Sequence, residues 1–79
     1  MSKNKYDKAF VAAFDIDDAG LGPDLKYESI QEWDSIGHMG LIAELEDNFE
    51  ISMEMDDIID FSSYEYGKKI LKKYKIVIK

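Results

Sequence analysis

The stretch EWDSIGHMG, residues 32–40, places an aspartate, a serine and the only histidine within about one helical turn of each other. Ser35 and His38 could form a nucleophilic pair, in which the imidazole takes the hydroxyl proton. That chemistry also requires a cleft, an orienting acid and an oxyanion hole, and nothing in this short chain visibly supplies them. We therefore expect no enzymatic activity and expect His38 to line the upper part of the core.

Two roles for Ser35 stay open at this stage. Serine is a favoured helix N-cap, worth about 1 kcal/mol, and Asp34 beside it is an equally suitable cap. Alternatively, a hydroxyl at the start of a helix, after a long loop and beside acidic residues, is exposed. The amides of a helix N-terminus favour phosphate oxygens, so such a hydroxyl is well placed to carry a phosphodiester.

A second motif, DIDDAG at residues 15–20, resembles the opening of an EF-hand calcium loop. The match then fails, because position 5 of the loop is Ala19 and position 12, which should be a bidentate glutamate, is Lys26. We predict no metal site and expect the aspartates to end the first helix and solvate the loop. Weak divalent binding by Asp15, Asp17 and Asp18 stays open.

Composition bounds the class of protein. The chain has 79 residues, which predicts a single domain over residues 1–79. It contains no cysteine, so a disulfide framework, a thiolate metal site and a thiol nucleophile of the chain itself are excluded. The N-terminal residues lack the apolar stretch of a signal peptide, and no run approaches the ~18 residues that span a bilayer. We expect a cytoplasmic monomer with no membrane partner.

Charge is distributed unevenly within a net charge of −7. Residues 34–66 hold ten Asp or Glu and no Lys, whereas residues 67–79 hold six Lys and no acid. An acidic zone of this kind repels phosphate backbones and attracts basic protein surfaces. We therefore exclude nucleic acid and expect a basic protein partner, although an acidic surface that merely confers solubility would look the same.

Hydrophobic periodicity predicts the elements that position these residues. Aromatic and small residues at helical spacing predict a first helix over about 3–14, followed by a loop over 15–34 with a short helical turn somewhere in 24–32. A second helix is expected over about 35–50, a short third helix over about 56–60, and a fourth over about 63–74 that begins with a Ser62–Glu65 capping box. This pattern predicts an all-α fold, a small antiparallel four-helix bundle with three main helices, one short helix and a long first loop.

A row of small and flexible apolar residues lies beside the buried face of the second helix: Ile36, Met39, Gly40 and Ala43. Such residues, next to acids, suit a surface that accepts several partners in turn. The alternative is that Met39 and Ala43 simply widen the core face.

The segment WDSI, residues 33–36, followed by GHMGLIAELEDNFEI, resembles the Asp-Ser-Leu motif and second helix of the acyl carrier proteins, the wider family of phosphopantetheine-binding carriers. The resemblance spans nearly the whole chain: an aromatic first helix, a long loop, the motif, the acidic second helix, an Asp-rich short helix and a closing helix.

The resemblance implies that a separate phosphopantetheinyl transferase attaches 4'-phosphopantetheine from coenzyme A to Ser35. The thiol of this group then carries an acyl or aminoacyl cargo as a thioester, as in lipid or secondary metabolite biosynthesis. It implies that Asp34 helps the transferase to recognise the motif, and that loading and client enzymes with basic patches dock on the second and third helices. The residues implied in this docking are Ile36, Met39, Glu44, Glu46, Asp47, Asp56 and Asp57.

This chain departs from the family pattern at three positions. Ile36 replaces the usual leucine, and Gly37 and Gly40 stand where fatty-acid carriers often have an acid. The departure at Gly40 favours a specialised stand-alone carrier over a housekeeping one, and bulky aromatic residues near the core favour a short or polar cargo. The competing interpretation is an unmodified acidic module that docks to a basic partner through the second helix, with Ser35 as a mere cap.

Overall fold

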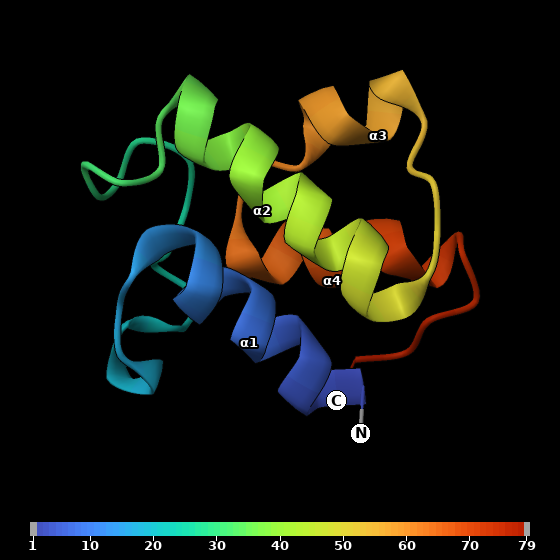
Figure 1. Ribbon diagram of the computed structural model, residues 1–79, viewed down its shortest axis with the longest axis horizontal. Coiled ribbons are helices and arrows are strands. Elements are labelled where there is room, and N and C mark those ends of the chain that lie inside the picture. Colours follow the sequence, from blue (N-terminus) through green and yellow to red (C-terminus); the bar gives the residue numbers. More distant parts are fainter. Residues whose placement is uncertain (1, 79) are drawn as a thin grey trace.

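Four α-helices and one 3-10 turn make up the regular structure of the computed structural model, which describes residues 2–78 (Figure 1). They are α1 (Ser2–Phe14), η1 (Asp18–Gly20), α2 (Ser35–Phe49), α3 (Met55–Asp60) and α4 (Tyr64–Lys72). No strand occurs among the described residues, so the small, compact domain is mostly helical. Within that part of the chain, none of the helices has both the length and the apolar character needed to cross a membrane.

The core is built on aromatic rings from α1. Tyr6, Phe10 and Phe14 lie one turn apart along this helix and are almost completely buried. Phe10 packs edge to face against Trp33, with ring centroids 5.7 Å apart, and Phe14 lies 5.1 Å from the same indole. Leu41, Ile42 and Leu45 close this core from α2, which lies beside α1 (Figure 1). The 3.6-residue period in the sequence therefore predicted the buried faces of α1 and α2.

The long loop between α1 and α2 is held down by its own apolar residues and by backbone bonds. Leu25 and Trp33 are buried. The Tyr27 amide donates to the Ser62 carbonyl at 2.8 Å, and the Tyr64 amide donates to the Leu25 carbonyl at 2.9 Å. These two bonds keep the chain around Lys26 extended, so the short helical turn predicted within residues 24–32 is wrong, and the loop's helical turn is η1.

These two backbone hydrogen bonds, which form a bridge between Lys26 and Ser63, also move the start of α4 from its predicted position. Ser63, not Ser62, is the N-cap: its Oγ accepts from the Tyr66 amide at 2.9 Å. The predicted Ser62–Glu65 capping box is therefore wrong, because the Ser62 carbonyl is already paired with the loop. Tyr66 is exposed, and the buried face consists of Tyr64, Gly67, Ile70 and Leu71.

A buried carboxylate joins α3 to the end of α4. Asp57 accepts hydrogen bonds from Lys73 Nζ at 2.6 Å and from the Tyr74 hydroxyl at 2.5 Å. These donors hold the pKa of the Asp57 carboxyl below its usual value. The Tyr74 hydroxyl also accepts from the Glu54 amide, so the N-terminal half of the short helix α3 is tied to the C-terminal segment.

Replacing Asp57 should make the protein less sensitive to acid. Because the folded-state pKa is lowered, the stabilisation from Asp57 is complete above the ordinary aspartate pKa and is lost as the pH falls through the lowered value. We expect Asp57→Asn to lose about 1 kcal/mol of unfolding free energy at neutral pH. The loss is small because solvent around the largely exposed Lys73 screens its interaction with Asp57. Below about pH 4 the difference from wild type should shrink. Urea unfolding at several pH values measures this, with the exposed Asp60→Asn as control, and a difference that stays constant with pH would contradict it.

Candidate functional site

Asp34 caps helix α2. Its backbone is extended, its Oδ1 accepts a hydrogen bond from the Gly37 amide at 2.8 Å, and its carbonyl accepts from the His38 amide at 2.7 Å. Ser35 is therefore the first residue of the helix rather than its cap. Of the two roles that the sequence left open for Ser35, capping belongs to its neighbour.

The Ser35 side chain is consequently uncommitted. The residue is exposed, and within the described part of the chain no group forms a hydrogen bond with its hydroxyl. Its position in the first turn of a fifteen-residue helix favours negative charge, because the amides and the dipole of the helix N-terminus are oriented toward it. These properties fit a hydroxyl that is esterified to a phosphate group.

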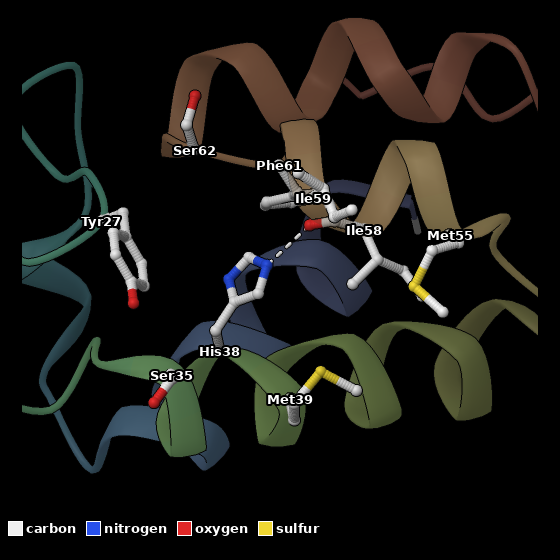
Figure 2. A pocket seen from close by; sticks show the side chains of 9 residues that line it. All are labelled: Tyr27, Ser35, His38, Met39, Met55, Ile58, Ile59, Phe61 and Ser62. Atoms are coloured by element: carbon white, nitrogen blue, oxygen red, sulfur yellow. Dashed lines mark hydrogen bonds between the residues drawn. The ribbon is translucent and has the colours of Figure 1, made fainter.

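His38 has both ring nitrogens engaged elsewhere. The Trp33 indole N–H donates to His38 Nδ1 at 2.9 Å. His38 Nε2 lies 2.7 Å from the Ile58 carbonyl oxygen (Figure 2). An indole nitrogen can only donate, so Nδ1 is the acceptor and Nε2 carries the proton that is donated to Ile58. His38 is half-buried, and this arrangement leaves neither nitrogen for the Ser35 hydroxyl.

An apolar cavity of about 370 Å³ opens beside Ser35. Figure 2 shows that its walls come from the start of α2, from α3, from the segment that links α3 to α4, and from the long loop. The lining residues are Tyr27, Ser35, His38, Met39, Met55, Ile58, Ile59, Phe61 and Ser62. Among them, only the two serines, the tyrosine hydroxyl and the histidine offer polar side-chain atoms, so the cavity suits an apolar group.

Large apolar side chains are exposed on α2 and α3, and three of them, Met39, Met55 and Ile59, line the cavity. Ile36 is 82% exposed, Met55 and Ile59 are each 69% exposed, and Met39 is 56% exposed. Met39 therefore belongs to the surface and does not widen the core, and Ala43 is exposed as well. The sequence analysis missed Met55 and Ile59, although their spacing of four residues in α3 places both on one helix face.

The residues expected to meet partners fall into two groups. Asp34, Ile36, Met39, Asp47 and Asp56 are exposed, and Glu44 is half-buried. Glu46 instead uses its carboxylate inside the molecule, where it accepts from the Met53 amide at 2.8 Å, and Asp57 is buried against Lys73 and Tyr74. The structure brings Ser35 and Met39 together at the cavity, with Asp34 and Ile36 flanking them in sequence.

The two glycines of α2 occupy very different surroundings. A Cβ at Gly37 would overlap the Glu32 carbonyl oxygen, so this glycine permits the close approach of the loop to the first turn of the helix. Nothing lies within 4 Å of a Cβ placed at Gly40. Gly37 is thus a steric requirement of the site, whereas Gly40 leaves open space on the exposed side of α2.

The aspartates of the DIDDAG motif are distributed over the end of α1 and the start of η1. Across residues 2–78, no three His, Asp or Glu side chains gather as a group that could hold a metal ion. Asp15 ends α1 in the left-handed conformation, and Asp17 precedes η1.

Substitutions at Asp34 and Ser35 test which of these two residues caps α2. Asp34→Ala should lower the free energy of unfolding by about 1 kcal/mol, because the Gly37 amide loses its partner. Ser35→Ala should change it by less than about 0.5 kcal/mol, because Ser35 does not cap the helix. Asp34→Asn keeps the capping oxygen and serves as control. Chemical denaturation measures all three, and a larger loss for Ser35→Ala than for Asp34→Ala would refute the assignment.

The glycines supply a matched pair of variants. Gly37→Ala should destabilise the protein by roughly 2 kcal/mol, because the loop backbone at Glu32 must move. Gly40→Ala should stabilise it by about 1 kcal/mol, the difference in helix propensity. Thermal unfolding of both variants tests this, and equal effects of the two substitutions would contradict the close contact at Gly37.

Comparisons with protein-family models, with curated proteins and with solved structures gave no significant match.

Proposed function

We propose that this protein is a carrier of the acyl carrier type, an antiparallel four-helix bundle that bears 4'-phosphopantetheine on Ser35 and presents an acyl or aminoacyl cargo to client enzymes. One observation carries the proposal: the Ser35 hydroxyl is exposed and unpaired in the described structure, since Asp34 caps α2, and it lies beside an apolar cavity. The resemblance of the sequence around Ser35 to the carrier motif supports the same conclusion.

The residues present fit the prosthetic group. Ser35 would hold it through a phosphodiester, formed when the hydroxyl oxygen displaces 3',5'-ADP from coenzyme A and gives up its proton. The amides in the first turn of α2 favour the negative charge of that phosphate. When bound, the group supplies a thiol that holds the cargo as a thioester, a function that no side chain of this cysteine-free chain provides.

The surface near Ser35 supports docking to a succession of basic partners. Ile36 and Met39 expose flexible apolar area on α2, and Asp34, Asp47 and Asp56 are exposed acids on or beside α2 and α3. Acids of this kind steer a partner with a basic patch, and the apolar groups supply contact area once it has docked. Glu46 and Asp57 are left out of this proposed surface, because their carboxylates are used inside the fold.

A second function is favoured by the same surface. Ile36, Met55 and Ile59 are exposed among acids whether or not Ser35 is modified. An unmodified module that docks to a basic partner would use them equally well. Modification of Ser35 distinguishes the two functions.

Intact-mass measurement tests the carrier function. Incubation with coenzyme A and a broad-specificity phosphopantetheinyl transferase should add the mass of one phosphopantetheinyl group to the wild-type chain. Ser35→Ala should gain none. Ser62→Ala should be modified like wild type, and it is the matched control because Ser62 is a second exposed serine on the same cavity.

Two outcomes would overturn the proposal. One is an unmodified wild-type chain in a reaction where an established carrier protein is fully modified. The other is modification that persists in Ser35→Ala and disappears in Ser62→Ala. The first outcome, together with binding to a basic partner that Ser35→Ala leaves intact, would establish the unmodified docking module instead.

A further inference from the structure

The inner wall of the cavity is held by a chain of two hydrogen bonds. Trp33 is fully buried and packs against the rings of Phe10 and Phe14, so its indole N–H is a fixed donor. It orients His38, whose other nitrogen donates to the Ile58 carbonyl in α3. The imidazole also lies nearly parallel to the indole, with an interplanar angle of 15°. The core therefore determines where His38 points.

The last acceptor in this pair of hydrogen bonds is the Ile58 carbonyl, which has no hydrogen-bond donor within α3. α3 has only six residues, and Ile58 lies in its last turn, where carbonyl oxygens have no partner within the helix. His38 supplies the missing donor across the cavity (Figure 2). Loss of this bond would leave the carbonyl without its partner and α3 without its direct polar contact to α2.

The remaining attachments of α3 are elsewhere. Asp57 and the Glu54 amide bind Tyr74, and Asp57 also binds Lys73, so these bonds tie α3 to the C-terminal segment. Met55 and Ile59 are exposed and line the cavity, and the half-buried Ile58 side chain packs against the core. The His38 bond is thus the polar contact that keeps α3 close to the start of α2, and the separation of these two helices sets the depth of the cavity.

The cavity is large enough for a short apolar group. Cavities of about 150 Å³ with apolar walls hold benzene, and a volume of about 370 Å³ exceeds that more than twofold. At roughly 30 Å³ for each water-sized group, it accommodates on the order of ten non-hydrogen atoms. The residues that line it include Phe61, which is almost fully buried, and the hydrogen-bonded pair His38 and Ile58.

We propose that the Trp33–His38–Ile58 hydrogen-bond chain is a latch that limits the depth of the cavity beside Ser35, so that the cavity admits short apolar groups and excludes long ones while the latch is closed. His38 is then a positioning residue that determines cargo length. The inference rests on the proposed function, because the group on Ser35 would bring the cargo to the cavity. A longer chain fits only if α3 separates from α2 and the His38 bond breaks.

The test compares cargo lengths in two latch variants. Wild type, His38→Gln and His38→Leu are loaded with hexanoyl- or dodecanoyl-pantetheine groups, and intact mass verifies the loading. His38→Gln retains one acceptor and one donor, whereas His38→Leu retains neither. In wild type and His38→Gln, the hexanoyl group should raise Tm by about 4 °C or more over the unacylated form, and the dodecanoyl group should raise it less. In His38→Leu this order should reverse.

A measurement on wild type stands independently of the variants. Trp33 is the only tryptophan, and its indole N–H signal reports the bond to His38. The NMR resonances of this N–H and of the His38 ring should stay unchanged with the hexanoyl group and shift with the dodecanoyl group. Shifts that are equal for the two groups would overturn the latch, even if His38→Leu failed to fold.

Failure of the latch is distinguishable from failure of the carrier function. If no loading occurs, the carrier function fails, and the latch is then tested on the unmodified chain with free 1-hexanol and 1-decanol. Hexanol should shift the amide resonances of Ile58 and Ile59 in wild type, and decanol should do so only in His38→Leu. If loading succeeds but both chain lengths stabilise wild type equally, the carrier function stands and the latch is wrong.

Discussion

The imidazole of His38 is the constraint on which the site depends. Its two nitrogens connect three parts of the chain that are separate in sequence: the end of the long loop at Trp33, the first turns of α2, and the last turn of α3. A side chain with one donor and one acceptor on opposite sides of a rigid ring can make both connections, and few others can. Because Trp33 is itself fixed in the aromatic core of α1, the two hydrogen bonds of His38 connect the packing of α1 to the backbone of α3.

At the beginning of α2, neighbouring residues take the structural roles and leave the Ser35 hydroxyl without a hydrogen bond among the described residues. A helix start needs a side-chain acceptor, and Asp34 supplies it. The preceding loop also has to pass close to the first turn, which Gly37 permits because a Cβ there would overlap the Glu32 carbonyl oxygen. With capping and chain entry assigned to its neighbours, Ser35 has no structural task. A residue that is exposed, lies in the first turn of a helix and forms no side-chain hydrogen bond among the described residues can be modified without the loss of such a bond.

The sequence predicted what depends on short-range periodicity and missed what depends on contacts distant in the chain. The buried faces of α1 and α2 follow from spacings of three and four residues and were predicted correctly. The predicted N-cap of α4, Ser62, is one residue earlier than the observed N-cap, Ser63. The difference arises because the bridge between Lys26 and Ser63 joins segments that no local pattern connects. For the same reason, the sequence singled out Ser35 and His38 but could not show that His38 turns away from Ser35 toward a carbonyl twenty positions later. Met55 and Ile59 were missed because a six-residue helix is too short for its period to reveal which side is exposed.

Not all the acidic residues in the sequence have carboxylates that are available at the surface. Glu46 and Asp57 lie in the same acidic zone as Asp47 and Asp56, yet the first two satisfy amide, ammonium and hydroxyl donors inside the fold. Asp57 in particular is retained as an anion, since the donors around it hold its pKa below the usual value. Acids that are committed in this way cannot also meet a basic patch at a docking interface. In the proposed docking surface, the apolar contact area near Ser35 would therefore come from the exposed side chains of Ile36, Met39, Met55 and Ile59, and the remaining exposed acids would supply the long-range attraction toward a basic partner.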